Sequence, residues 1–356
     1  MTRRTRTAVR RSSADLGAIA VSVAVAVLSA AAVAAAEAEQ RSGTAQQAVG
    51  VSRPTKGSLP RTPFGQPDLQ GVWSFSTLTP LERPAELAGK EFLTEKEAAA
   101  FAAAKTRALD HDTPEGAENA CKGTGNYNEV WYERGSTVVK TRRTSLIVDP
   151  PDGKIPPLTA EGMKRRATLA AARAARGPAD SWEDLDVNDR CLVGFNAGPP
   201  MMPSGYNNNV QLFQTPDYFV ILTEMVHDAR IVPLDGRPHT SPNVRQWAGI
   251  SRGHWDGDTM VVETINFSEK NAFRGAGPRM RLIERFTRTG ADTLMYEVTV
   301  DDPETFTKPW TFQVPMSPVD GKIYEYACHE GNYGLAGILA GARADERRAT
   351  ESGTRR

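Results

Sequence analysis

Residues 254–267 read HWDGDTMVVETINF, in which a tight Asp-Gly turn is followed at once by a β-branched strand. The surrounding stretch, from Tyr206 to Tyr333, repeats this pattern of short strands and turn residues. We expect strands there at 210–215, 218–226, 229–234, 249–255, 258–267, 279–289, 292–301, 306–316 and 322–328. Their short connections exclude a parallel sheet, because each parallel connection needs a crossover of about a dozen residues or more. The sequence therefore predicts a mainly β fold, built on an antiparallel meander.

The length of this meander predicts closure. A long antiparallel sheet tends to curl until its two edges meet, which removes unpaired strand edges from solvent. A closed barrel of about eight strands has room for its own side chains or for one small ligand. We therefore expect residues 206–340 to form a closed or nearly closed barrel. The strand count is the basis for expecting a lipocalin-like barrel. The earlier segment Gly71-Val72-Trp73 resembles the first strand of lipocalins, and the alternative is that Trp73 is a core residue of an ordinary strand.

Two helix patterns lie before the barrel, in the region 64–205. One runs from about 94 to 109 and begins with TEKE, the signature of a capping box. The other runs from about 159 to 176 and is rich in alanine. We expect both helices, with a few short strands, to pack on the outside of the barrel. The charged segment 341–356 after the barrel is predicted to be a disordered tail.

The N-terminus has the pattern of an export signal. A basic segment from Arg3 to Arg11 precedes an apolar run from Leu16 to Ala36, which ends in Ala-x-Ala motifs. We expect residues 1–36 to be a signal peptide and 37–63 to be a disordered leader. The protein is then periplasmic or secreted. The alternative is an uncleaved anchor, and only then is a membrane a partner.

The charge balance argues against nucleic acid as a partner. The chain carries 43 basic and 43 acidic side chains, and its first 36 residues hold five of the arginines and one aspartate. The remainder therefore has 38 basic and 42 acidic groups. Nucleic-acid binding usually needs a clustered basic face. We predict no nucleic-acid partner.

The chain has three cysteines, Cys121, Cys191 and Cys328. In an oxidising compartment three thiols usually form one bridge and leave one over. We favour a bridge between Cys191 and Cys328, because these two bracket the strand-rich stretch and close a long loop. Pairing with Cys121 is the alternative that the sequence leaves open.

Four segments carry a resemblance to a family. They are RTSLIVDPPDG at 143–153, VPLDGRPH at 232–239, WDGDT at 255–259 and YEYACHEGN at 324–332. In these segments the chain resembles a family of uncharacterised exported bacterial proteins. The resemblance implies export and a β-rich fold. It implies no activity, substrate or site residue.

Three carboxylates lie in phase with apolar neighbours in the expected strands: Glu224, Glu263 and Glu284. Because side chains alternate between the two faces of a strand, we expect all three to point into the barrel. A buried carboxylate either pairs with a cation or has its pKa raised, which suits acid-base catalysis. The alternative is a structural network of internal ion pairs. Its arginine partners are then Arg230, Arg274, Arg281 and Arg285.

Histidines at predicted loops supply further candidates. His227 lies at a hairpin beside Asp228 and close to Arg230, and His239 follows in the next loop. Histidine exchanges protons near neutral pH, and arginine binds anionic oxygens. The acid-base candidates are Glu263, Glu284 and His227. The ligand-binding candidates are Glu224, Arg230, His239, Arg274, His329 and Glu330.

Other kinds of site find no support in the sequence. The histidine spacings match no compact metal motif, and no nucleophile elbow, phosphate loop or dinucleotide fingerprint occurs. We predict no metal and no cofactor. The stiff apolar loop GPPMMPSG at 198–205 either lines a pocket or covers one end of the sheet.

Together these patterns predict an exported β-barrel that binds a small, partly apolar molecule in a pocket lined by Glu, Arg and His side chains. One alternative is a hydrolase, lyase or isomerase that uses the same carboxylates and histidine for acid-base catalysis. A second alternative is a structural envelope protein, which is favoured if aromatic side chains fill the barrel.

Overall fold

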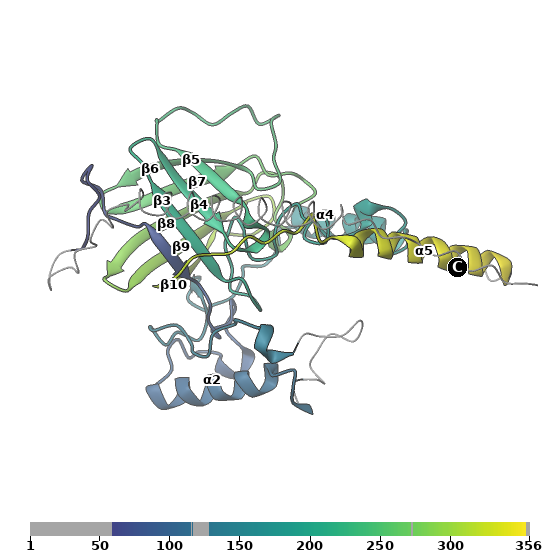
Figure 1. Ribbon diagram of the computed structural model, residues 1–356, viewed down its shortest axis with the longest axis horizontal. Coiled ribbons are helices and arrows are strands. Elements are labelled where there is room, and N and C mark those ends of the chain that lie inside the picture. The colour runs from purple at the N-terminus through teal and green to yellow at the C-terminus, as the bar shows by residue number, and fades with distance from the viewer. Residues whose placement is uncertain (1–58, 115, 117–127, 272, 354–356) are drawn as a thin grey trace, which may run out of the picture. The chain divides into compact units, whose positions relative to one another are not determined.

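The computed structural model describes residues 59–114, 116, 128–271 and 273–353 (Figure 1). Its main feature is an antiparallel sheet with the strand order β5-β4-β3-β1-β10-β9-β8-β7-β6. The strands of this path are β1 (Gly71–Ser74), β3 (Asn209–Gln214), β4 (Tyr218–Thr223), β5 (Ala229–Pro233), β6 (Ile250–Asp256), β7 (Thr259–Ile265), β8 (Arg281–Gly290), β9 (Thr293–Asp301) and β10 (Trp310–Pro318). A further strand, β2 (Ile147–Asp149), pairs with β10 outside the path. The predicted mainly β, antiparallel fold is confirmed.

The sheet forms a nearly closed barrel with one unsealed seam, between β5 and β6. At the seam the two strands are in contact through side chains. A Cβ atom on Gly253 of β6 would lie 2.8 Å from Leu234 Cδ2 and 2.9 Å from Val232 Cγ1. Glycine at this position therefore lets β6 approach β5 closely. The predicted closed or nearly closed barrel is confirmed.

Aromatic side chains fill the interior of the barrel. Their rings contact one another in series, with centroid distances of 5.3 Å for Phe219 and Phe286, 4.9 Å for Phe286 and Tyr296, and 6.4 Å for Tyr296 and Phe312. All four residues are less than 2% exposed. Burial of such large rings is a major source of stability, and tilted ring pairs add to it. The interior is therefore a packed core, and the spaces described below lie outside it.

Three helices accompany the sheet in the described part of the chain: α2 (Glu95–Leu109), α4 (Ala160–Ala174) and α5 (Tyr333–Glu351). The predicted capping box is present at α2, where Thr94 Oγ1 accepts a hydrogen bond from Glu97 N. Ahead of α4, Thr159 N donates to Thr305 O at 2.9 Å, which ties this helix to the connection between β9 and β10. The two helices predicted in the N-terminal half are confirmed. Short 3-10 turns are η1 (Ala85–Leu87), η2 (Glu129–Trp131), η3 (Trp182–Asp184), η4 (Met225–His227) and η5 (Phe273–Gly275).

Two predictions for the C-terminal part are wrong. Residues 322–328 form no strand, and Tyr324 is 79% exposed. The position that they were expected to fill is taken by β1, which pairs with both β3 and β10. The expected disordered tail is largely helical, because α5 extends to Glu351 and is capped by Asn332, whose Oδ1 accepts from Leu335 N. The expected signal peptide and most of the leader lie outside the described residues.

Cys191 and Cys328 form the predicted disulfide, with Cα atoms 5.7 Å apart and a sequence separation of 137 positions. Cys121 lies outside the described residues. A disulfide is typical of proteins in an oxidising compartment. Among the described helices, none combines the length and the apolar character that crossing a membrane requires.

Candidate functional site

Glu284 points into the barrel from β8, as predicted, and is completely buried. Arg230 of β5 binds it with both terminal nitrogens, Nη1 to Oε2 at 2.5 Å and Nη2 to Oε1 at 2.9 Å. The hydroxyl of Tyr296 donates to Oε1 at 2.6 Å. These three residues, which we call the inner triad, place a fully paired charge inside the aromatic core.

The surroundings of the inner triad fix the protonation states of Arg230 and Tyr296. Burial alone would lower the pKa of Arg230, but the charge and hydrogen bonds of Glu284 outweigh burial and raise it. Burial, followed by the charge of Glu284, raises the pKa of Tyr296 well above its usual value. Arg230 therefore stays charged and Tyr296 neutral at ordinary pH. This arrangement favours the internal ion pair over acid-base chemistry at Glu284.

The inner triad also supports the loop 198–205. Met201 N donates a hydrogen bond to the Tyr296 hydroxyl at 3.1 Å. Further along the loop, Ser204 N donates to Asn208 Oδ1 at 2.8 Å, and Asn208 Nδ2 donates back to Ser204 O at 2.9 Å. The loop is thus fixed at two points, one to the barrel core and one to the residues that precede β3.

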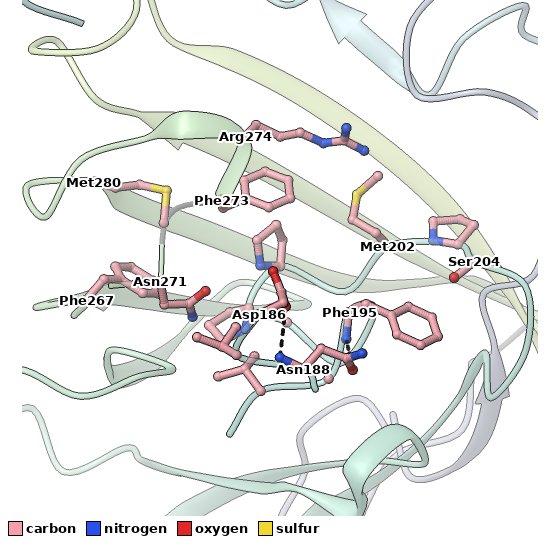
Figure 2. Close-up of a pocket in the computed structure, with 17 residues that line it drawn as sticks. Asp186, Asn188, Phe195, Met202, Ser204, Phe267, Asn271, Phe273, Arg274 and Met280 are labelled. Atoms are coloured by element: carbon pink, nitrogen blue, oxygen red, sulfur yellow. Dashed lines mark hydrogen bonds between the residues drawn. The ribbon is translucent and has the colours of Figure 1, made fainter. Parts of the chain in front are cut away.

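A cavity of about 380 Å³ lies against this loop, and we call it the mouth cavity (Figure 2). Its walls come from the segments 186–195, 198–204 and 267–280. The apolar part of the wall includes Phe195, Met202, Phe267, Phe273 and Met280. The Phe273 ring stacks on Trp310 with centroids 6.1 Å apart, so this wall continues into the barrel core. Of the two readings of the stiff loop, lining a pocket is the one that the geometry supports.

Arg274 supplies the positive charge of the mouth cavity. Its guanidinium forms no ion pair or hydrogen bond with any residue that the structure describes, and Figure 2 shows the side chain extending from Phe273 toward Met202 and Ser204. A second cavity, of about 340 Å³, shares Arg274, Met202 and Ser204 with the first. Arg274 therefore stands in a wall common to two spaces. Asp186, whose Oδ1 accepts from Asn188 N at 2.9 Å, is the acidic group of the mouth cavity.

Glu263 does not point into the barrel, contrary to the prediction. The inward side chains of β7 are Met260, Val262 and Thr264, which are completely buried, and Glu263 alternates with them. On the outer face it accepts from Arg281 Nε at 2.9 Å and lies 3.3 Å from His239 Nε2. Burial lowers the pKa of His239, although Glu263 acts in the opposite direction. The prediction failed because Val261, on the same face of β7 as Glu263, is also buried. The alternation of apolar residues therefore did not show which face of the strand points inward.

Glu224 is buried, but not by the strand alternation from which its burial was predicted. Strand β4 ends at Thr223, and its inner face carries Phe219 and Ile221. Glu224 lies just beyond the strand, where Asn209 Nδ2 donates to its Oε2 at 2.8 Å. Burial raises the pKa of Glu224, and the hydrogen bond from Asn209 partly opposes this effect.

His227 lies in η4, in a strained piece of backbone. Val226 and His227 both have left-handed φ values, 63° and 55°, which are costly for a β-branched residue such as valine. The ring of His227 is half-buried, and its Nδ1 has no hydrogen-bond partner among the residues described. The contacts of Glu263 described above are with Arg281 and His239. The acid-base pairing of Glu263 with His227 therefore has no geometric support.

The remaining predicted ligand-binding residues are His329 and Glu330. Both are exposed in the turn before α5, and neither lines the mouth cavity. The structure therefore joins Glu284 with Arg230, and Glu263 with His239, and places Arg274 in the cavity wall. Sequence reasoning missed Asp186 and Asn188. The only available signal for this region was the stiffness of the loop at 198–205.

No group of three or more His, Cys, Asp or Glu side chains in the described ranges is arranged to hold a metal ion. Comparison of the chain with protein-family models, with curated proteins and with solved structures finds no match.

Proposed function

We propose that this protein is an exported β-barrel that binds a small, partly apolar molecule with an anionic group. The binding site is the mouth cavity, in which the apolar body of the ligand contacts Phe195, Phe273 and Met202. Ligand sites are typically apolar hollows with a few placed polar groups, and a volume of about 380 Å³ falls in their usual range.

The observation that carries this proposal is the unpaired guanidinium of Arg274. Other arginines have an acidic partner, as Arg230 has Glu284 and Arg143 has Glu91, whereas Arg274 is exposed at the cavity and has none among the described residues. Arginine presents a fork of donors that matches a carboxylate, sulfonate or phosphate. At the opposite end of the ligand, Asp186 would accept a hydrogen bond from a hydroxyl or amine group.

Export is supported by the basic and apolar N-terminal sequence and by the disulfide between Cys191 and Cys328. These two features together support a periplasmic or secreted location. The enzymatic alternative loses its acid-base pair, because Glu263 lies on the outer face of the barrel and Glu284 is held in an internal ion pair. The filled barrel interior favours the structural alternative for the barrel itself, so the binding proposal rests on the mouth cavity outside it.

The test uses two fluorescent probes of almost equal shape. 1-Anilinonaphthalene-8-sulfonate carries an anionic group, and N-phenyl-1-naphthylamine is its uncharged analogue. We expect Arg274→Gln to weaken binding of the sulfonate by about tenfold or more, since a hydrogen-bonded charge contributes about 1.5–3 kcal/mol. Binding of the uncharged probe should remain within about twofold.

Arg279→Gln is the matched control, because Arg279 is in the same segment, is exposed and pairs with Glu304. It should leave both probes unaffected, and circular dichroism should show that both variants are folded. Equal loss of sulfonate binding in the two variants, or equal weakening of both probes by Arg274→Gln, would rule out Arg274 as an anion-binding residue.

A further inference from the structure

A separate cavity of about 350 Å³ shares no lining residue with the mouth cavity. It is lined by Trp131, Glu133, Tyr206, Asn207 and Tyr326. These residues come from three parts of the chain: the segment around η2, the approach to β3, and the segment that the disulfide holds before α5. The wall thus combines three aromatic side chains with one carboxylate.

Glu133 belongs to a pair of carboxylates. Asn209 Nδ2 donates to Glu133 Oε1 at 3.2 Å and to Glu224 Oε2 at 2.8 Å, so a single amide nitrogen lies between the two groups. Asn209 is 8% exposed and Glu224 is 9% exposed. The Oδ1 atom of Asn209 has no hydrogen-bond partner within the described residues. Asn209 therefore links a buried carboxylate, Glu224, to an exposed one, Glu133, which lines the cavity.

No cation compensates this pair in the described part of the chain. The nearest arginine in sequence, Arg134, forms its ion pair with Glu129 and packs over the ring of Tyr132, 3.7 Å from the ring centroid. Glu284 and Asp184, two carboxylates with little exposure, each have a cationic partner, Arg230 and Arg176. Buried Asp302 is held by hydrogen bonds from Gly277 and Thr305 instead. Buried charges are normally paired. Glu133 and Glu224 have no cationic partner among the described residues, and a cationic ligand beside Glu133 would supply one.

The chemistry of the wall narrows the choice of ligand. The faces of Trp and Tyr rings carry negative potential and attract cations, and aromatic cages of this kind recognise quaternary ammonium groups. A neutral ligand would leave the acidic pair uncompensated. A Ca²⁺ ion needs about six or more oxygen ligands, which two carboxylates do not provide, and it gains little from aromatic rings.

We propose that this cavity binds an organic ammonium ion, with the cationic head among Trp131, Tyr206 and Tyr326 and beside the carboxylate of Glu133. Glu224 strengthens the negative potential from behind Glu133, and Asn209 fixes the spacing of the two groups. This site is distinct from the mouth cavity and does not depend on the function proposed for it.

The test compares choline with 3,3-dimethylbutan-1-ol, its uncharged analogue of the same shape, by calorimetry on the full-length protein. We expect choline to bind at least about tenfold more tightly than the alcohol. Glu133→Gln and Trp131→Leu should each weaken choline binding by about tenfold. The alcohol should respond to Trp131→Leu and not to Glu133→Gln.

The control variants are Glu304→Gln and Trp182→Leu, which change an exposed acid and an exposed tryptophan that do not line this cavity. They should leave choline binding unchanged. Equal binding of choline and the alcohol would overturn the proposal, as would unchanged choline binding in Glu133→Gln. Displacement of choline by Ca²⁺ at an equal concentration would assign the site to a metal ion instead. Failure here is distinguishable from failure at Arg274, because the naphthalene probes report on the mouth cavity.

Discussion

At the scale of single residues, the strongest constraint is the charge on Arg230 inside the aromatic core. Its side chain is 9% exposed and the carboxylate that it binds is completely buried. The pair does not by itself prove high stability, because taking two charges out of water is costly. Removing only one partner is strongly destabilising, because the other charge is then left buried and unpaired.

We therefore expect Glu284→Gln to lower the free energy of unfolding by about 3–5 kcal/mol. The matched control is Glu263→Gln, which removes a carboxylate that pairs with a partly exposed arginine, Arg281, on the outer face. The control should cost about 1 kcal/mol or less, because solvent screens that pair. Urea denaturation of the two variants measures the difference. Similar losses would mean that the inner triad is not the special position that its burial indicates.

Residue types were predictable at these sites, but their partners were not. Phase along the strand correctly placed Glu284 inside, because Leu282 and Phe286 on either side are buried as well. The same reasoning failed for Glu263, since apolar residues occupy both faces of β7. The pairing of Glu133 with Glu224 through Asn209 depends on contacts between residues far apart in sequence, which no local pattern reveals.

At the scale of elements, the barrel closes through the unsealed seam. The edge strands β5 and β6 approach each other without forming a ladder, and Gly253 provides the space for Val232 and Leu234. An edge strand normally exposes unpaired backbone groups and needs protection. Close side-chain packing across the seam is the protection that this barrel has.

Gly253→Ala tests this packing. The new methyl group would lie 2.8 Å from Leu234 Cδ2 and 2.9 Å from Val232 Cγ1, and Val232 is completely buried. Overpacking of this kind typically costs about 1–3 kcal/mol. We also expect faster hydrogen exchange of backbone amides in β5 and β6 than in the wild-type protein, with little change in β8 and β9.

A double variant separates this contact from other effects. When Leu234→Ala is combined with Gly253→Ala, the loss of unfolding free energy should be smaller than the sum of the two separate losses, because the two side chains then no longer clash. Strictly additive costs would show that the seam is not closed by this contact.

Most strands were predictable because each one is a local pattern bounded by turn residues. The strands β3 to β10 lie close to their predicted positions. The exception, 322–328, alternates in sequence but is exposed, and the disulfide at Cys328 ties its end to Cys191. Pattern shows that a segment is able to form a strand. Whether it does so depends on a free sheet edge, and β1 already pairs with both neighbours that such a strand would need.

At the scale of the whole molecule, the sequence predicted the class of fold but not the way in which the ligand space arises. A barrel of this size was expected to be hollow, whereas large rings fill its interior. The mouth cavity is instead built from irregular segments on either side of the loop 198–205, which hydrogen bonds to Tyr296 and Asn208 hold in place. Irregular segments have no periodicity, so their arrangement emerges only when the barrel has formed.

The disulfide is the covalent constraint on this arrangement, because Cys191 and Cys328 are 137 positions apart in sequence and the loop that they close includes the strands β3 to β10. In the chain-entropy model, closing a loop of this length stabilises the folded state by about 4–5 kcal/mol, and native disulfides usually contribute about 2–5 kcal/mol. We expect the double variant Cys191→Ser, Cys328→Ser to lose stability in that range, measured by urea denaturation in a Cys121→Ser background that prevents exchange with the third thiol.

The shape of the unfolding transition is a second readout. Because the loop contains most of the barrel, the loss of stability should appear as one cooperative shift of the whole unfolding transition rather than as a separate early phase. A separate early phase confined to α5 would show that the bridge anchors only the C-terminal segment, which Asn332 also holds through its hydrogen bond to Asp189 O at 2.8 Å.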